Sequence, residues 1–129
     1  MGFEDRSFKA AEQLTRKGAG VLTWMRAGTT TSAADSLAIP VTHAYVIKTT
    51  GADAEALTLA NGSPGQELLI NLTTDGGGTG TLTPATSTGW ATAVFADAGD
   101  VIYVRYINDT IGWILLGTYG LTAQPTITV

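Results

Sequence analysis

The fold class of this chain is decided by the stretch Val41-Thr42-His43-Ala44-Tyr45-Val46-Ile47-Lys48. Successive side chains of a β-strand point to opposite faces, so the odd-numbered residues of this stretch share one face and the even-numbered residues share the other. The larger side chains Val41, His43, Tyr45 and Ile47 alternate with Thr42, Ala44, Val46 and Lys48, which follows the strand period of two and not the helical period of 3.6. The stretch therefore predicts a β-strand that contributes to a sheet.

Similar short runs recur through the rest of the chain, and glycine-rich turns separate them. About eight short strands at intervals of 8–12 residues are typical of a sandwich or barrel. The 22 threonines and 16 glycines favour strands and turns over helices. We expect an all-β fold, an antiparallel β-sandwich of jelly-roll type. The further runs are Ala56–Leu59, Glu67–Leu72, Thr81–Pro84, Trp90–Phe95, Val101–Ile107, Trp113–Gly117 and Thr126–Val129.

The chain has 129 residues, a length that predicts one folded domain. Residues 41–129 are expected to form the β-sandwich domain, and residues 1–40 an N-terminal arm and linker. Within the arm, Ser7 and Gly18 bracket a possible short helix around residues 7–17. Val21 to Arg26 has the pattern of a strand, whereas residues 27–38 are small and polar and are expected to form an extended linker.

Charge divides the chain into two parts. Residues 1–26 have a net charge of +2, whereas residues 27–129 have a net charge of −6. Such a division indicates that the arm contacts a different surface from the body, the alternative being a solvated terminus. The scattered cations do not form the dense patch that nucleic-acid binding requires. The arm residues predicted to bind a partner protein are Phe3, Arg6, Phe8, Lys9, Leu14, Arg16, Lys17, Trp24 and Arg26.

Residue types that carry most hydrolytic and metal chemistry are scarce. The chain has no cysteine and a single histidine, His43, which lies on the predicted strand and is expected to have no catalytic role. The glycine-rich segment 75–81 lacks the lysine of a phosphate-binding loop and predicts a hairpin turn. Asp75, Asp97 and Asp100 are expected to hydrogen-bond the backbone of their own turns. We expect no enzyme activity, no cofactor and no metal site.

Aromatic residues allow two interpretations. Trp90 and Trp113 each follow a glycine at the start of a predicted strand, which favours packing in the core or in a subunit contact. The alternative is a platform on which sugar rings stack, formed by the tryptophans together with tyrosines such as Tyr103 and Tyr119. The sequence leaves both open.

The body also resembles a known family along Thr50–Gly120. It is similar to a β-domain of tailed-bacteriophage virion structural proteins, among them head-decoration (cement) and head-fibre proteins. The shared residues are mostly turn and strand residues, so no functional side chains transfer with the resemblance. They are Gly51–Leu59, Asn61–Gln66, Asp75–Pro84, Gly89-Trp90, Phe95–Asp100 and Gly112–Gly117.

The resemblance implies a non-catalytic β-domain, usually trimeric, on a capsid or fibre. The expected function is capsid decoration: a homotrimer binds the major capsid protein on the outside of the head and stabilises the lattice. The expected location is the virion surface, after synthesis in the host cytoplasm, with no nucleic-acid or membrane partner. The longest apolar runs, such as Ile114-Leu115-Leu116, are far shorter than the roughly 20 residues of a membrane span. The alternative is a receptor- or carbohydrate-binding module of a fibre or tail.

Overall fold

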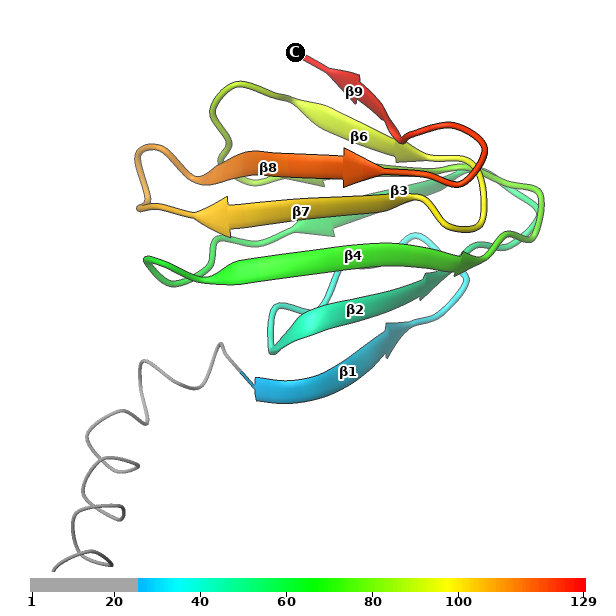
Figure 1. Ribbon diagram of the computed structural model, residues 1–129, viewed down its shortest axis with the longest axis horizontal. Coiled ribbons are helices and arrows are strands. Elements are labelled where there is room, and N and C mark those ends of the chain that lie inside the picture. Colours follow the sequence, from blue (N-terminus) through cyan, green and yellow to red (C-terminus); the bar gives the residue numbers. More distant parts are fainter. Residues whose placement is uncertain (1–25) are drawn as a thin grey trace, which may run out of the picture.

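Alternating side chains build two stacked β-sheets in the computed structural model, which describes residues 26–129. One sheet has five strands in the order β1-β2-β4-β7-β8, and the other has four in the order β3-β5-β6-β9 (Figure 1). The all-β sandwich expected from the sequence is confirmed. The strands are β1 (Arg26–Ser32), β2 (His43–Thr49), β3 (Glu55–Leu59), β4 (Glu67–Thr74), β5 (Gly80–Pro84), β6 (Thr92–Phe95), β7 (Val101–Tyr106), β8 (Trp113–Tyr119) and β9 (Thr126–Thr128).

The core lies between the two sheets, because every second side chain of the central strands points inward. In β4, Leu68, Ile70 and Leu72 are fully buried, and the residues between them are half-buried on the opposite face. The other core residues are Ile39, Val46, Leu57, Leu59, Leu82, Trp90, Ala93, Phe95, Ile102, Val104, Tyr106 and Trp113.

Strand direction corrects the expected topology. The pairs β1–β2, β2–β4 and β3–β5 are parallel, whereas β4–β7, β5–β6, β6–β9 and β7–β8 are antiparallel. A jelly roll is made of antiparallel Greek keys, so these pairings do not confirm it. The reason is the route of the chain, which alternates between the two sheets from β2 to β5. Each return to the same sheet therefore adds a parallel strand.

A strand, β1, also lies before the boundary expected at residue 41. Arg26–Ser32 pairs with β2 as the edge strand of the five-stranded sheet, although residues 27–32 were expected to form part of an extended linker. The segment after β1 then crosses to the other sheet, where Ile39 donates a backbone hydrogen bond to Thr58 and is buried in the core. Threonine favours strands even without apolar alternation, and pairing with β2 decides the outcome here. The described part of the sandwich therefore includes β1 as well as the strands after residue 41.

Candidate functional site

Of the partner-binding residues predicted in the arm, one lies within the described residues. Arg26 is the first residue of β1 and pairs in register with His43 of β2. The remaining ones lie outside the described residues, as does the possible helix around residues 7–17. They are Phe3, Arg6, Phe8, Lys9, Leu14, Arg16, Lys17 and Trp24.

The surface with the most distinctive chemistry is the outward face of the five-stranded sheet. Residues paired in register on adjacent strands point to the same face of a sheet, which aligns side chains from β2, β4, β7 and β8 in two rows. We define the outer face by the six large apolar or aromatic side chains of these rows. They are Tyr45, Ile47, Leu69, Val101, Tyr103 and Tyr119.

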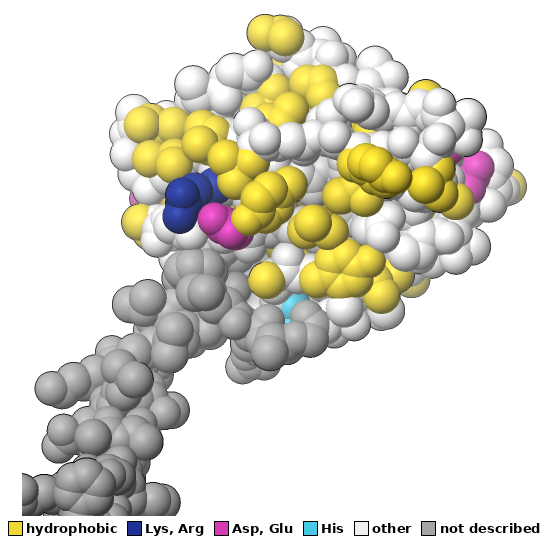
Figure 2. Space-filling view, viewed as in Figure 1, with side chains coloured by type: hydrophobic (Ala, Val, Ile, Leu, Met, Phe, Trp, Pro, Cys, Tyr) yellow, Lys and Arg dark blue, Asp and Glu magenta, His cyan; other side chains and the backbone are white. Residues whose placement is uncertain are grey.

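Most of the outer face is only half-buried, and Tyr119 is 57% exposed. Figure 2 shows hydrophobic side chains spread over this side of the molecule. Asn71 lies in the row between Ile47 and Val101. Its Nδ2 donates to the Tyr45 hydroxyl at 2.9 Å, but its Oδ1 is buried and has no hydrogen-bond partner within residues 26–129. The outer face therefore combines apolar area with one unsatisfied acceptor.

Charge on this side of the sheet is confined to one end. Arg105 and Glu67 form an ion pair at 3.5 Å, with both side chains well exposed. The Tyr103 hydroxyl donates a hydrogen bond to Glu67, and this bond, together with burial and the carboxylate charge, raises the pKa of Tyr103. The six side chains that define the outer face carry no formal charge themselves.

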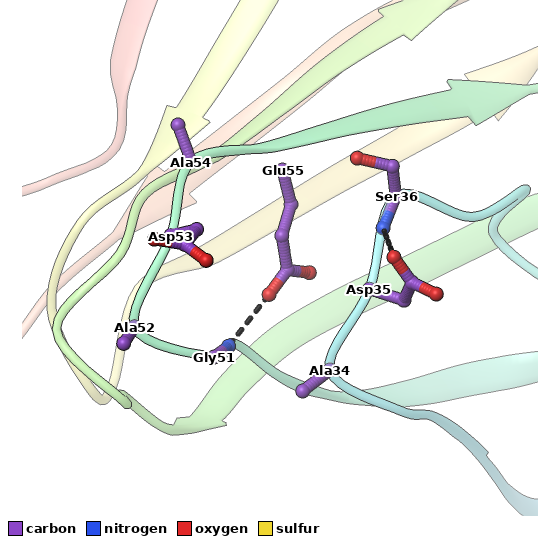
Figure 3. Close-up of a pocket in the computed structure, with 8 residues that line it drawn as sticks. All are labelled: Ala34, Asp35, Ser36, Gly51, Ala52, Asp53, Ala54 and Glu55. Atoms are coloured by element: carbon purple, nitrogen blue, oxygen red, sulfur yellow. Dashed lines mark hydrogen bonds between the residues drawn. The ribbon is translucent and has the colours of Figure 1, made fainter.

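A second feature is a pocket of about 180 Å³ between the loop after β1 and the loop before β3. Figure 3 shows Glu55 between these loops, with its carboxylate accepting a hydrogen bond from the Gly51 backbone N–H. Asp35 accepts from the backbone N–H of Ser36, its own neighbour. The pocket is lined by Ala34, Asp35, Ser36, Gly51, Ala52, Asp53, Ala54 and Glu55.

Beneath the pocket, Lys48 is buried and fully paired. Its Nζ donates to Glu55 Oε1 and to the Ala33 carbonyl, both at 2.6 Å, and to the Asp35 carbonyl at 3.3 Å. Burial by itself would raise the pKa of Glu55, but hydrogen bonds from Lys48 and the backbone, with the charge of Lys48, lower it overall. An ammonium group has three N–H donors, and each has an acceptor here. Lys48 thus links β3 to the loop after β1, and its ammonium group has no N–H donor left for a ligand.

Two of the three acids assigned to turns, Asp75 and Asp100, bond backbone N–H groups as the sequence predicts, whereas Asp97 contributes its backbone N–H to Asp100. Asp75 Oδ1 accepts from the Gly77 backbone N–H at 2.8 Å. Asp100 Oδ2 accepts from the backbone N–H groups of Ala96 and Asp97 at 2.8 and 3.1 Å. Within residues 26–129, no three acidic or histidine side chains gather as metal ligands would. His43 lies on β2 with Nδ1 3.0 Å from the Thr42 hydroxyl.

Trp90 and Trp113 belong to the core. For these two residues the structure therefore supports core packing and not a sugar-binding platform. Trp113 is fully buried, donates from Nε1 to the Ala60 carbonyl, and packs edge-on against Tyr106 with ring centroids 5.2 Å apart. Trp90 is 4% exposed and donates to the Trp113 carbonyl. These rings cannot stack on a sugar in solution.

Sequence reasoning missed the Lys48–Glu55 pair and the acceptor on Asn71. Lys48 lies two positions after the buried Val46 and therefore on the same face of β2. This spacing is the one sequence signal that could have predicted the burial of Lys48. Its partner belongs to the other sheet, so no local pattern connects the two residues.

Comparison of the sequence with protein-family models and with curated proteins found no match. Within residues 26–129, no helix is long and apolar enough to cross a membrane.

Proposed function

We propose that this chain is a capsid decoration protein of the tailed-bacteriophage type. It binds the major capsid protein on the outside of the head as a homotrimer, and its N-terminal arm makes the lattice contact. The resemblance of Thr50–Gly120 to head-decoration and head-fibre β-domains supports this class of function. The location that follows is the virion surface.

The observation that carries the proposal is the junction at Arg26. The arm continues directly into β1, which is hydrogen-bonded along β2 at the edge of the five-stranded sheet. An arm anchored in this way transmits a contact with the capsid to the whole body. The change from a net charge of +2 to −6 falls at the same place. The arm and the body thus differ in charge.

The polar clusters of the body also fit a structural protein. The ion pair of Lys48 and the turn aspartates Asp75 and Asp100 bond mainly to the chain's own backbone. A general base needs a free site facing a substrate. Lys48 Nζ, Asp75 Oδ1 and Asp100 Oδ2 already make hydrogen bonds, and Asp100 Oδ1, which has no partner among the described residues, is buried. Their arrangement stabilises the sandwich.

Decoration would stabilise a head by mass action. A protein that binds only the assembled lattice adds its binding free energy to the assembled state. Three linked subunits would strengthen weak contacts, because the second and third arms bind at a high effective concentration.

Mixing purified protein with undecorated heads tests the proposal. The full chain should saturate the heads at a fixed number of copies, and a variant lacking residues 1–18 should not bind while its body remains folded. Thr58→Lys, a charge change at an exposed site on β3, is the control and should bind normally. Equal binding by the truncated variant, or no binding by the full chain, would contradict the proposal.

A receptor- or carbohydrate-binding module is the second candidate. Tyr45, Tyr103 and Tyr119 share the outer face, where aromatic rings are partly accessible. This candidate predicts that the protein binds host cells or glycans, and that Tyr119→Ala weakens that binding. Binding to cells without binding to heads would favour it over decoration.

A further inference from the structure

The connector from β3 to β4, residues 60–66, carries the chain from the four-stranded sheet to the five-stranded sheet (Figure 1). It contains the dipeptide Asn61-Gly62, and Asn61 is exposed. Within residues 26–129, neither the Asn61 amide nor the Gly62 backbone N–H makes a hydrogen bond. Both groups are therefore free to react with each other.

The other two asparagines of the chain are held in place. Asn71 lies in β4, and the backbone N–H that follows it, that of Leu72, donates to the Asp100 carbonyl at 2.8 Å. Asn108 Oδ1 accepts hydrogen bonds from two backbone N–H groups of its own turn, at 2.9 and 2.8 Å. Neither of them is followed by glycine. Asn61 is thus distinguished from both by its surroundings and by its neighbour.

We propose that Asn61 is a site of spontaneous deamidation. The Gly62 backbone nitrogen attacks Asn61 Cγ and forms an N–Cγ bond. The Cγ–Nδ2 bond breaks, and Nδ2 leaves as ammonia with the proton of the attacking nitrogen. Water then opens the succinimide ring at either carbonyl, which gives aspartate or isoaspartate. Glycine favours the attack because it has no Cβ and restricts the backbone least.

The two products differ in the length of the main chain. Aspartate keeps that length and adds only a charge, whereas isoaspartate routes the chain through Cβ and Cγ and lengthens it by one methylene. The main chain here lies against the core. Trp113 Nε1 donates to the Ala60 carbonyl at 2.9 Å, and a Cβ on Gly62 would lie 3.0 Å from the Trp113 ring.

The connector is also anchored after Gly62. The Ser63 backbone N–H donates to Gln66 Oε1 at 2.9 Å, and the buried Gln66 donates from Nε2 to the Val41 carbonyl at 2.8 Å. With anchors on both sides, an added methylene displaces at least one of them. A buried donor that loses its acceptor is costly, so isoaspartate destabilises the packing around Trp113 and aspartate does not.

Ageing of the purified full chain in mildly alkaline buffer tests the site. Peptide mass spectrometry should show conversion of amide to acid at Asn61 several-fold sooner than at Asn71 or Asn108. Asn61→Gln keeps an amide but cyclises far more slowly, so its peptide should stay unconverted over the same period. Conversion at Asn61 that is no faster than at the other two asparagines would overturn the proposal.

A second measurement tests the structural effect. The aged protein is separated by ion exchange into its aspartate and isoaspartate forms, and the two are identified by fragmentation of the peptide. The isoaspartate form should melt several degrees below the parent protein. Asn61→Asp has the same charge on a main chain of normal length, so it is the matched control and should melt like the parent. Equal melting temperatures for the isoaspartate form and Asn61→Asp would refute the effect on the core. These measurements use isolated protein, so their outcome is independent of head binding.

Discussion

Lys48 Nζ lies 2.6 Å from Glu55 Oε1, and this buried contact joins the two sheets of the sandwich. Lys48 belongs to β2 in the five-stranded sheet, and Glu55 is the first residue of β3 in the four-stranded sheet. Through the Ala33 and Asp35 carbonyls, the same ammonium group also fixes the loop that follows β1. A buried charge is tolerated only when it is paired and hydrogen-bonded, so these contacts depend on one another.

Removal of one partner of this pair should therefore be more harmful than removal of both. Lys48→Met leaves Glu55 buried without its cation, and we expect a loss of about 3–5 kcal/mol in the free energy of unfolding. The double variant Lys48→Met/Glu55→Leu should recover a large part of that loss. Urea unfolding of the two single variants and the double variant measures the coupling. Strictly additive losses would show that the pair is not a unit.

Acid should destabilise the protein through Glu55. Its pKa is lowered in the folded state, so its contribution to stability is present above the ordinary glutamate pKa of 4.5. The contribution is lost as the pH falls through the folded value, because protonation then favours the unfolded chain. Thermal melts between pH 6 and about pH 3 should show a smaller decrease for Glu55→Gln than for the parent protein. An identical decrease in both would assign the acid sensitivity to other carboxylates.

Alkali should destabilise the protein through Tyr106. Burial and a hydrogen bond donated to Asp109 raise the pKa of Tyr106 to about 12. A raised folded pKa stabilises the fold below the unfolded value of about 10, and that contribution is lost as the pH rises toward 12. Tyr106→Phe should have a flatter stability profile over this range, as measured by chemical denaturation. If the slope is the same for Phe, the ionising group lies elsewhere.

Three glycines should differ in their tolerance of alanine. Gly112 has a φ of 71°, and a Cβ at this position would lie 2.1 Å from the Thr86 carbonyl oxygen. Gly112→Ala should therefore cost more than the roughly 1–2 kcal/mol of a left-handed residue alone. Gly89, with a φ of 87° and open space around it, should lose only that amount. Gly117 has neither restriction, and Gly117→Ala should be neutral or stabilising. Unfolding free energies that do not follow this order would contradict the geometry.

The protein should be a trimer at micromolar concentration. The last 20 residues, 110–129, contain no charged side chain, and Leu116, Leu121 and Val129 are exposed among them. Exposed apolar residues without charges around them favour contacts between subunits. Light scattering should give three times the chain mass, and Leu121→Lys should reduce it. A monomeric mass for the parent protein would refute the trimer and weaken the decoration proposal.

The sequence alone determined which residues form most strands and where the chain turns. The period of two in Val41–Lys48 is reproduced by β2, although its buried face is the one with Val46 and Lys48 and not the one with Tyr45 and Ile47. The turn roles of Asp75 and Asp100 are confirmed by hydrogen bonds to nearby backbone N–H groups. These features are local: a strand alternates with period two, and an aspartate in a turn bonds a residue two to four positions away. They need no information about the rest of the fold.

Only the tertiary structure decided strand direction, the place of β1 and the burial of Lys48. A strand has the same alternation in a parallel and in an antiparallel pair, so the pattern cannot reveal that the chain alternates between sheets. The residues of β1 lack apolar alternation and become a strand because β2 offers them hydrogen bonds. Lys48 is buried because Glu55 and the Ala33 carbonyl meet it from other parts of the chain. Each of these outcomes depends on partners that only folding brings together.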